Sequence, residues 1–423
     1  MDTGKIITVN IDDMTERGIG VARVDGAVVF VPELVTGDKA DVRILIREKN
    51  YFTAEAVKVT VSSPLRVKSA CDVKDCGGCT LCHINYEEEN KIKKNSVRNA
   101  FRRSGLPFDM VEDTVHSANR TAYRNKITVH YSKTARAFGL YAEGSNDVVP
   151  FTSCVICPNI MSEVICFTNE NIALLPDDFA ESLCVRTNSC GKVTVSVYTN
   201  KLVNIDSYKA AVREKFDSVE NIVLIVDGCG GCFIEDRITG VDMRFSSEAF
   251  RQVNHEAFEK LLGVVHSMAN EACFSTAADL YCGSGVIGLT LAKAFPEAKF
   301  YGIEINPDAV SDAKYNKSAN GIENIEFFCG DSASFKKRVG KGKLPELIVV
   351  DPPRAGLSKE MRNGLAELSP KEIIYVSCNP QTLARDIASL RSFGYEIGRV
   401  VPVNMFPMTA HSECVVSLTR KDQ

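Results

Sequence analysis

The chain has 423 residues, of which 45% are hydrophobic and 25% charged, a composition typical of a globular protein with two or three domains. No apolar run reaches about 18 residues and the N-terminus lacks signal-peptide features, so we expect a cytoplasmic protein without a membrane span. In that reducing compartment the 16 cysteines are not expected to form disulfides, and tight clusters of them favour metal binding or catalysis.

Short β-like runs separated by Gly and Asp turns fill residues 1–60. This pattern predicts a small β-barrel of the OB type. Basic and aromatic residues late in this unit suit contact with RNA phosphates and bases, although Phe52 can equally be a core aromatic: Arg43, Arg47, Lys49, Tyr51 and Phe52.

Four cysteines lie within twelve positions after this unit, at Cys71, Cys76, Cys79 and Cys82, and Cys154 and Cys157 follow later. The spacing from Cys71 to Cys79 resembles that of plant-type [2Fe–2S] proteins, whereas the spacing from Cys76 to Cys82 resembles a bacterial ferredoxin run. Zinc is a further possibility. The residues alone therefore predict a metal site without deciding which metal it holds.

Residues 61–245 are expected to form a central mixed α+β domain. Within it, a polar helix is expected at 87–103, which can pack on the catalytic domain. The net charge of −4 does not indicate a nucleic-acid-binding protein, yet between Lys91 and Arg136 eleven lysines and arginines stand against three acidic residues. Such a patch can follow a phosphate backbone, and a solvated helix face explains it equally well.

Residues 246–423 alternate between apolar strand-like runs and helical segments. This alternation predicts a doubly wound α/β sheet of Rossmann-like type, which we expect to end in an antiparallel edge hairpin.

The first of these strands runs into Asp279-Leu-Tyr281-Cys-Gly283-Ser-Gly285-Val-Ile-Gly288, and the second ends in Glu304, 21 residues after Gly283. Glycines let a ligand approach the backbone, and an acidic residue at that distance suits ribose hydroxyls. The motif satisfies G-x-G-x-x-G, so a nicotinamide dehydrogenase has to be considered. The later Asp331 and Asp351-Pro-Pro-Arg354 instead resemble S-adenosylmethionine-dependent methyltransferases, in which Asp331 would lie near the adenine.

Cys378 follows another apolar run, Ile373–Ser377, and therefore also lies at a strand end. Asp351, Arg354 and the later Glu413 are placed in the same way. A thiol at that edge is a candidate nucleophile, with a nearby carboxylate as its general base.

Five motifs in this order resemble the RNA uracil-C5 methyltransferase family, and residues 1–60 resemble the TRAM domain of many members. The resemblance spans nearly the whole chain: Phe250-Arg-Gln252-Val-Asn, Asp279-Leu-Tyr281-Cys-Gly283-Ser-Gly285, Asp351-Pro-Pro-Arg354, Val376-Ser-Cys378-Asn-Pro and Phe406-Pro through His411-Ser-Glu413.

The resemblance implies that S-adenosylmethionine binds at Gln252, Tyr281, Glu304 and Asp351, that Cys378 is the nucleophile and that Glu413 is the base. It also implies a [4Fe–4S] cluster on Cys71, Cys76, Cys79 and a distant cysteine, for which we choose Cys154, with Cys157 as the alternative.

Cysteine suits this chemistry because the nucleophile must add to uracil C6 and later leave again. The N-terminal unit and the cysteine cluster favour 23S rRNA as the target, with tRNA as the alternative, and nothing in the sequence indicates an obligate protein partner. A non-catalytic RNA-binding iron–sulfur protein and an NAD-dependent oxidoreductase are the remaining readings.

Overall fold

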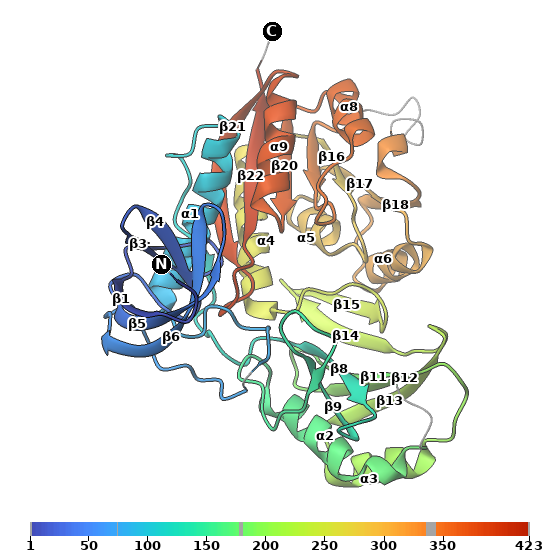
Figure 1. Cartoon of the computed structure of the whole chain (residues 1–423). Coiled ribbons are helices and arrows are strands. Elements are labelled where there is room, and N and C mark those ends of the chain that lie inside the picture. Colours follow the sequence, from blue (N-terminus) through green and yellow to red (C-terminus); the bar gives the residue numbers. More distant parts are fainter. Residues whose placement is uncertain (1, 74, 177–180, 336–343, 422–423) are drawn as a thin grey trace.

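The computed structural model describes residues 2–73, 75–176, 181–335 and 344–421. Figure 1 shows three bodies: a small N-terminal sheet, a central sheet with two helices below it, and a large C-terminal α/β unit above. No helix among the described residues is long and apolar enough to cross a membrane.

The N-terminal body is a six-stranded sheet in the order β1-β5-β6-β4-β3-β2, built from β1 (Ile6–Asn10), β2 (Asp13–Met14), β3 (Gly20–Val24), β4 (Ala27–Val31), β5 (Lys39–Arg47) and β6 (Tyr51–Val61). Alternate side chains such as Val29, Val42 and Ile44 fill its core, as the period of two along a strand dictates. Phe52 is a core residue and not an RNA-stacking platform, whereas Tyr51 is exposed beside Phe30.

Helix α1 (Tyr86–Arg103) connects the N-terminal half of the chain to the C-terminal unit. It begins where the Asn85 side chain accepts a hydrogen bond from the Glu88 amide at 2.8 Å. Its apolar face, with Val97 and Phe101, packs into the core of the C-terminal sheet beside α9.

The central sheet has the order β10-β9-β8-β11-β12-β13. Its core lies between the sheet and its helices, with Tyr208 and Val195 fully buried. The elements are β8 (Lys126–Ser132), β9 (Ala137–Tyr141), β10 (Val148–Val149), α2 (Asn159–Glu170), the 3-10 helix η1 (Ile172–Leu174), β11 (Ser182–Thr187), β12 (Val193–Thr199), α3 (Asp206–Lys215) and β13 (Val219–Val226).

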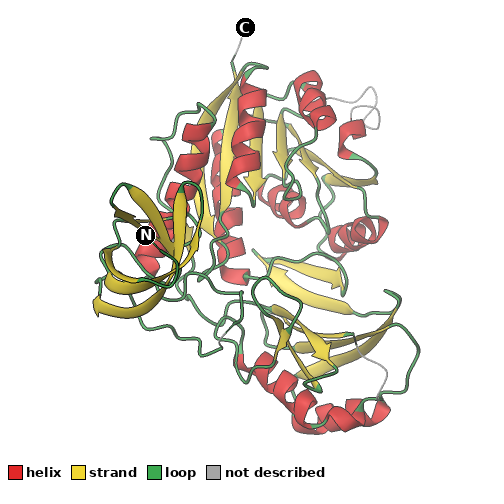
Figure 2. Cartoon of the chain, viewed as in Figure 1, coloured by secondary structure: helices red, strands yellow, loops and turns green. Residues whose placement is uncertain are grey.

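The C-terminal sheet has eight strands in the order β18-β17-β16-β19-β20-β22-β21-β7. Helices cover both of its faces (Figure 2): α4, α5 and α6 pack on one, and α1, α8 and α9 on the other. The strands are β7 (Val115–His116), β16 (Thr276–Leu280), β17 (Lys299–Glu304), β18 (Ile325–Cys329), β19 (Leu347–Val350), β20 (Glu372–Ser377), β21 (Tyr395–Asn404) and β22 (Glu413–Arg420). The helices are α4 (His255–Glu271), α5 (Val286–Ala294), α6 (Pro307–Ala319), η2 (Ser332–Ser334), α8 (Lys359–Leu368) and α9 (Pro380–Arg391).

Two details depart from the sequence expectation. The pair β21–β22 is antiparallel as expected but is not the edge, because the two-residue β7 adds to β21 in parallel. The hairpin of β14 (Phe233–Ile238) and β15 (Val241–Ser246) buries Met243 and Phe245 in the core beside α5 and α6, and the boundary expected at 245/246 lies inside β15.

Candidate functional site

Four of the expected site residues lie at one edge of the C-terminal sheet. Tyr281 follows β16, Glu304 ends β17, Asp351 follows β19 and Cys378 follows β20. Because β17, β16, β19 and β20 are neighbouring parallel strands, their carboxyl ends meet at the same edge. This is where open α/β sheets bind ligands.

A cavity of about 180 Å³ opens at this edge, and Gln252, Tyr281, Glu304 and Asp351 all line it. Glu304 is held in place by the backbone, since its Oε1 accepts from the Asn306 amide at 2.8 Å and its Oε2 accepts from the Gly283 amide at 3.2 Å. The four residues expected to bind S-adenosylmethionine therefore share one cavity.

The loop from β16 to α5 requires glycine. Gly285 has φ of +86°, and a Cβ there would lie 2.8 Å from the Phe327 ring. Below the loop, the buried Asp279 accepts from the Gly288 amide at 2.8 Å and so ties the strand to the first turn of α5. These contacts keep the loop backbone close to the space that a ligand would occupy.

Asp331 is the exception among the expected cofactor residues, because it is exposed and does not line this cavity within the described part of the chain. Its carboxylate accepts from the Ala333 amide at 2.9 Å and caps η2. It is close enough to Tyr281 for its charge to contribute to the raised pKa of that phenol.

Cys378 and Glu413 are brought together by strand register. β20 and β22 are antiparallel, and Ser377 pairs with Cys414 at the last step of their ladder. Continuing this register by one step brings Cys378 next to Glu413, and the Glu413 charge contributes to the raised pKa of the Cys378 thiol after burial. Two residues 35 positions apart in the chain are thus set side by side by backbone pairing.

Burial and mutual repulsion shape the charges of this edge. Desolvation raises the pKa of Asp351 to about 7, and desolvation together with Asp351 raises the pKa of Glu413 well above its usual range. The pKa of the Cys378 thiol rises to about 11 through burial and both carboxylates, and the Arg354 guanidinium opposes that rise. Burial at this edge therefore favours the protonated forms of Cys378 and Glu413.

Sequence reasoning missed Asp386, a fully buried carboxylate on α9. It accepts from the Leu357 amide at 2.7 Å and from the Tyr375 hydroxyl at 2.9 Å, and it pairs with Arg362 at 2.9 Å. These contacts fix the loop that follows Asp351. The one sequence signal was a charged residue at an apolar position of the helix pattern.

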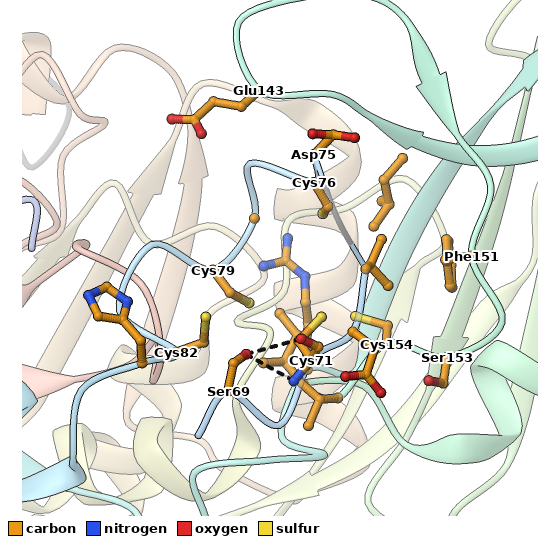
Figure 3. Close-up of a pocket in the computed structure, with 18 of the residues that line it drawn as sticks. Ser69, Cys71, Asp75, Cys76, Cys79, Cys82, Glu143, Phe151, Ser153 and Cys154 are labelled. Carbon is orange, nitrogen blue, oxygen red and sulfur yellow. Dashed lines mark hydrogen bonds between the residues drawn. The ribbon is translucent and has the colours of Figure 1, made fainter. Parts of the chain in front are cut away.

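The expected metal ligands surround a second cavity, of about 1170 Å³, between the segment that joins β6 to α1 and the central sheet. Figure 3 shows Cys71, Cys79, Cys82 and Cys154 around it, with Cys76 on the loop above. Cys157 is buried and is not part of this lining as far as the chain is described. No group of three or more His, Cys, Asp or Glu among the described residues is arranged to hold a metal ion.

The thiols of this cavity influence one another. Burial raises the pKa of Cys79 to about 12, and Cys154, Cys82, Cys71 and Cys76 add to that effect. Every described cysteine is a free thiol.

Comparison with known proteins agrees with this geometry. Residues 234–421 match the family model described as tRNA (Uracil-5-)-methyltransferase, and residues 2–57 match the TRAM domain. Two relatives named as uncharacterized RNA methyltransferases, from Clostridium acetobutylicum and Bacillus cereus, are each 32% identical, over 98% and 100% of this chain and 96% and 98% of theirs.

Among solved structures, a tRNA (uracil-54, C5)-methyltransferase of Pyrococcus abyssi in complex with S-adenosyl-L-homocysteine has a TM-score of 0.78 and 26% identity, and covers 98% of this chain and 100% of that chain. The resemblance inferred from the motifs is confirmed. The chain belongs to the family of S-adenosylmethionine-dependent RNA (uracil-5-)-methyltransferases and carries an N-terminal TRAM domain.

Proposed function

We propose that this protein forms 5-methyluridine in 23S rRNA, with Cys378 as the nucleophile and Glu413 as the base. The observation that carries the proposal is the register of β20 and β22, which brings the segments of Cys378 and Glu413 together near Asp351, a residue of the cofactor cavity. Both groups are then within reach of one flipped-out uracil, the geometry that base-modifying enzymes need.

The residues divide the reaction between them. The Cys378 sulfur bonds to uracil C6, C5 gains the methyl group, Glu413 removes the C5 proton, and the C6–sulfur bond then breaks to release the product. When bound, S-adenosylmethionine supplies the methyl group and a positive charge. Arg354 has the sign of charge that favours the reactive thiolate.

Gln252, Tyr281, Glu304 and Asp351 would hold the cofactor, because they line one cavity beside the glycine loop. Glu304 has the chemistry to accept from ribose hydroxyls, as an acidic residue at the end of the second strand does in nucleotide-binding sheets. Asp331 is assigned to the adenine end, since its charge acts on Tyr281 from outside the cavity.

For the cysteine cavity, we propose a [4Fe–4S] cluster on Cys71, Cys76, Cys79 and Cys154. Thiolates are the ligands of such clusters, and these four side chains line one space contributed by two distant segments. Cys154 faces that space and Cys157 does not, which supports Cys154 as the fourth ligand. The reaction is redox-neutral, so the proposed role is structural or RNA-organising.

Transfer RNA is the second candidate substrate, because the Pyrococcus abyssi relative carries tRNA in its name. The test is mass mapping of 5-methyluridine in 23S rRNA and in tRNA from cells that lack this gene. Loss from 23S rRNA alone supports the proposal. Loss of 5-methyluridine from tRNA alone would show that tRNA is the substrate. Unchanged 5-methyluridine in both RNAs would contradict the proposed function.

A further inference from the structure

The loop 405–412 joins β21 to β22 and ends directly before Glu413. It is anchored by a residue from outside its own domain, Lys93 on α1, whose side chain is only 1% exposed. The Lys93 ammonium donates to Asn404 Oδ1 at 2.5 Å, to the Phe406 carbonyl at 2.8 Å and to the His411 carbonyl at 2.9 Å. Its three hydrogens therefore fasten both ends of the loop.

Glu89, one turn earlier on α1, completes this anchor. Its Oε1 accepts from the Met408 amide and from Asn404 Nδ2, each at 2.9 Å, and its Oε2 accepts from Arg120 Nε at 3.0 Å. Lys93 Nζ and Glu89 Oε1 are 3.6 Å apart. Helix α1 thus holds the beginning, the middle and the end of the loop.

This arrangement costs stability, because a buried ammonium and a buried carboxylate both lose their hydration. Their mutual attraction and their hydrogen bonds offset that free-energy cost only when the geometry is good. An apolar pair of similar size would pack α1 against the sheet at lower cost. The loop carries His411, whose Nδ1 lies 3.3 Å from Arg354 Nη2, and it leads into Glu413. The buried charges therefore lie where they can act on the reaction site.

We propose that Lys93 is a positioning residue of the methyltransferase: it holds the loop 405–412 and favours the ionised form of Glu413 that takes the C5 proton. The inference rests on the proposed role of Glu413. It adds a second task for α1, which supplies a cation that acts on Glu413.

The charges around Glu413 support this role. Burial and the neighbouring Asp351 raise the pKa of Glu413, and Lys93 opposes them, while Cys378 and Cys414 are the thiols that the Glu413 charge acts on. Burial lowers the pKa of Lys93 to about 8, with Glu89 and Glu413 acting to raise it and Arg120 to lower it. Lys93 is therefore a cation at neutral pH, and removing it makes Glu413 harder to ionise.

The test is a single-turnover assay with tritiated methyl donor and total RNA from a strain lacking this gene, from pH 6 to pH 9. Lys93→Met should slow product release at pH 7 by about tenfold, a part of what loss of a general base costs. The covalent protein–RNA adduct should accumulate, and the pH midpoint for release should move upward. Lys371→Met is the control, since Lys371 pairs with Glu346 at 3.1 Å and is 69% exposed.

Lys93→Met leaves Glu89 buried without its cation and can fail to fold. The double variant Glu89→Gln/Lys93→Gln removes both charges and keeps groups that can hydrogen-bond to the loop. If Lys93→Met does not fold, this double variant tests the role of Lys93. An unshifted pH midpoint in the double variant overturns the inference, even if its activity is low, because a merely structural role changes the rate alone.

The two proposals fail in different ways. If Glu413→Gln releases product normally, the assignment of the base is wrong and the inference falls with it. If Glu413→Gln stalls as an adduct while both Lys93 variants keep the wild-type ratio of adduct to product at every pH, only the role of Lys93 is wrong.

Discussion

The catalytic edge and the cysteine cavity each gather reactive side chains from distant parts of the chain, but backbone pairing fixes only the first. Cys378 directly follows β20 and Glu413 begins β22, so the pairing of these two strands brings their segments together. The cysteine loop between β6 and α1 has sparse pairing, with isolated bridges such as Cys76 to Ala142 and Arg66 to Ile84. Backbone pairing therefore positions the residues of the first site, whereas the cysteine loop has only a few isolated bridges to hold it.

Removal of the nucleophile should have the largest effect. Cys378→Ala should lower methyl transfer by at least about a thousandfold, because the group that makes the covalent bond is lost while its surroundings remain. Transfer of a tritiated methyl group to RNA measures this, and binding of S-adenosylmethionine should stay near wild type. Cys329→Ala, at an exposed cysteine of the same domain, is the control. Activity within tenfold of wild type would show that the register does not identify the nucleophile.

Removal of the base should have a smaller and later effect. Glu413→Gln should still form the bond to C6 and transfer the methyl group, but it should slow product release by about a hundredfold or more, as loss of a general base does. Denaturing gel electrophoresis with labelled RNA should then show an accumulating protein–RNA band. Normal turnover without such a band would show that another group removes the C5 proton.

The sequence could predict that these side chains meet at one edge of the C-terminal sheet, because they lie in short motifs at strand ends. Cys378 and Asp351 each follow an apolar run, and a parallel sheet brings such positions together whatever the loops between them do. The same logic placed Glu304 and Tyr281 at one cavity. Asp331 does not line that cavity but caps η2, because a strand-end position does not say which way a side chain turns.

Other features could not be predicted, since they depend on contacts between segments far apart in the chain. Lys93 meets Asn404, 311 positions away, and a lysine on a polar helix gives no sign that it will be buried. The two-residue β7 has no periodicity to detect, and it covers the strand expected at the sheet edge. Phe52 could be read as core or as an RNA contact until the fold decided.

The cysteine cavity gives a prediction about metal. Protein purified without oxygen should hold about four iron atoms, the content of the proposed cluster. Cys154→Ser should lose iron and lower the melting temperature of the central domain, because cluster binding is coupled to folding. Cys157→Ser, three residues away, should keep its iron. Iron lost from Cys157→Ser but kept by Cys154→Ser would make Cys157 the fourth ligand. A colourless protein with stoichiometric zinc would contradict the iron–sulfur cluster.

The smallest expected effect concerns stability at the catalytic edge. Desolvation raises the pKa of the buried Asp279 to about 7 from its usual 3.8. A raised pKa favours the protonated form in the folded state. The stabilisation is therefore complete below pH 4 and is lost as the pH rises through about 7.

Replacing Asp279 with asparagine should remove this pH dependence while keeping an oxygen that can accept from the Gly288 amide. Relative to wild type, Asp279→Asn should gain stability between pH 5 and pH 8, by about 1–3 kcal/mol or several degrees in melting temperature. The exposed Glu323→Gln serves as the control. A difference between variant and wild type that is constant over this pH range would mean that the carboxylate is not penalised. Burial of Asp279 would then not make the stability of this part of the sheet depend on pH.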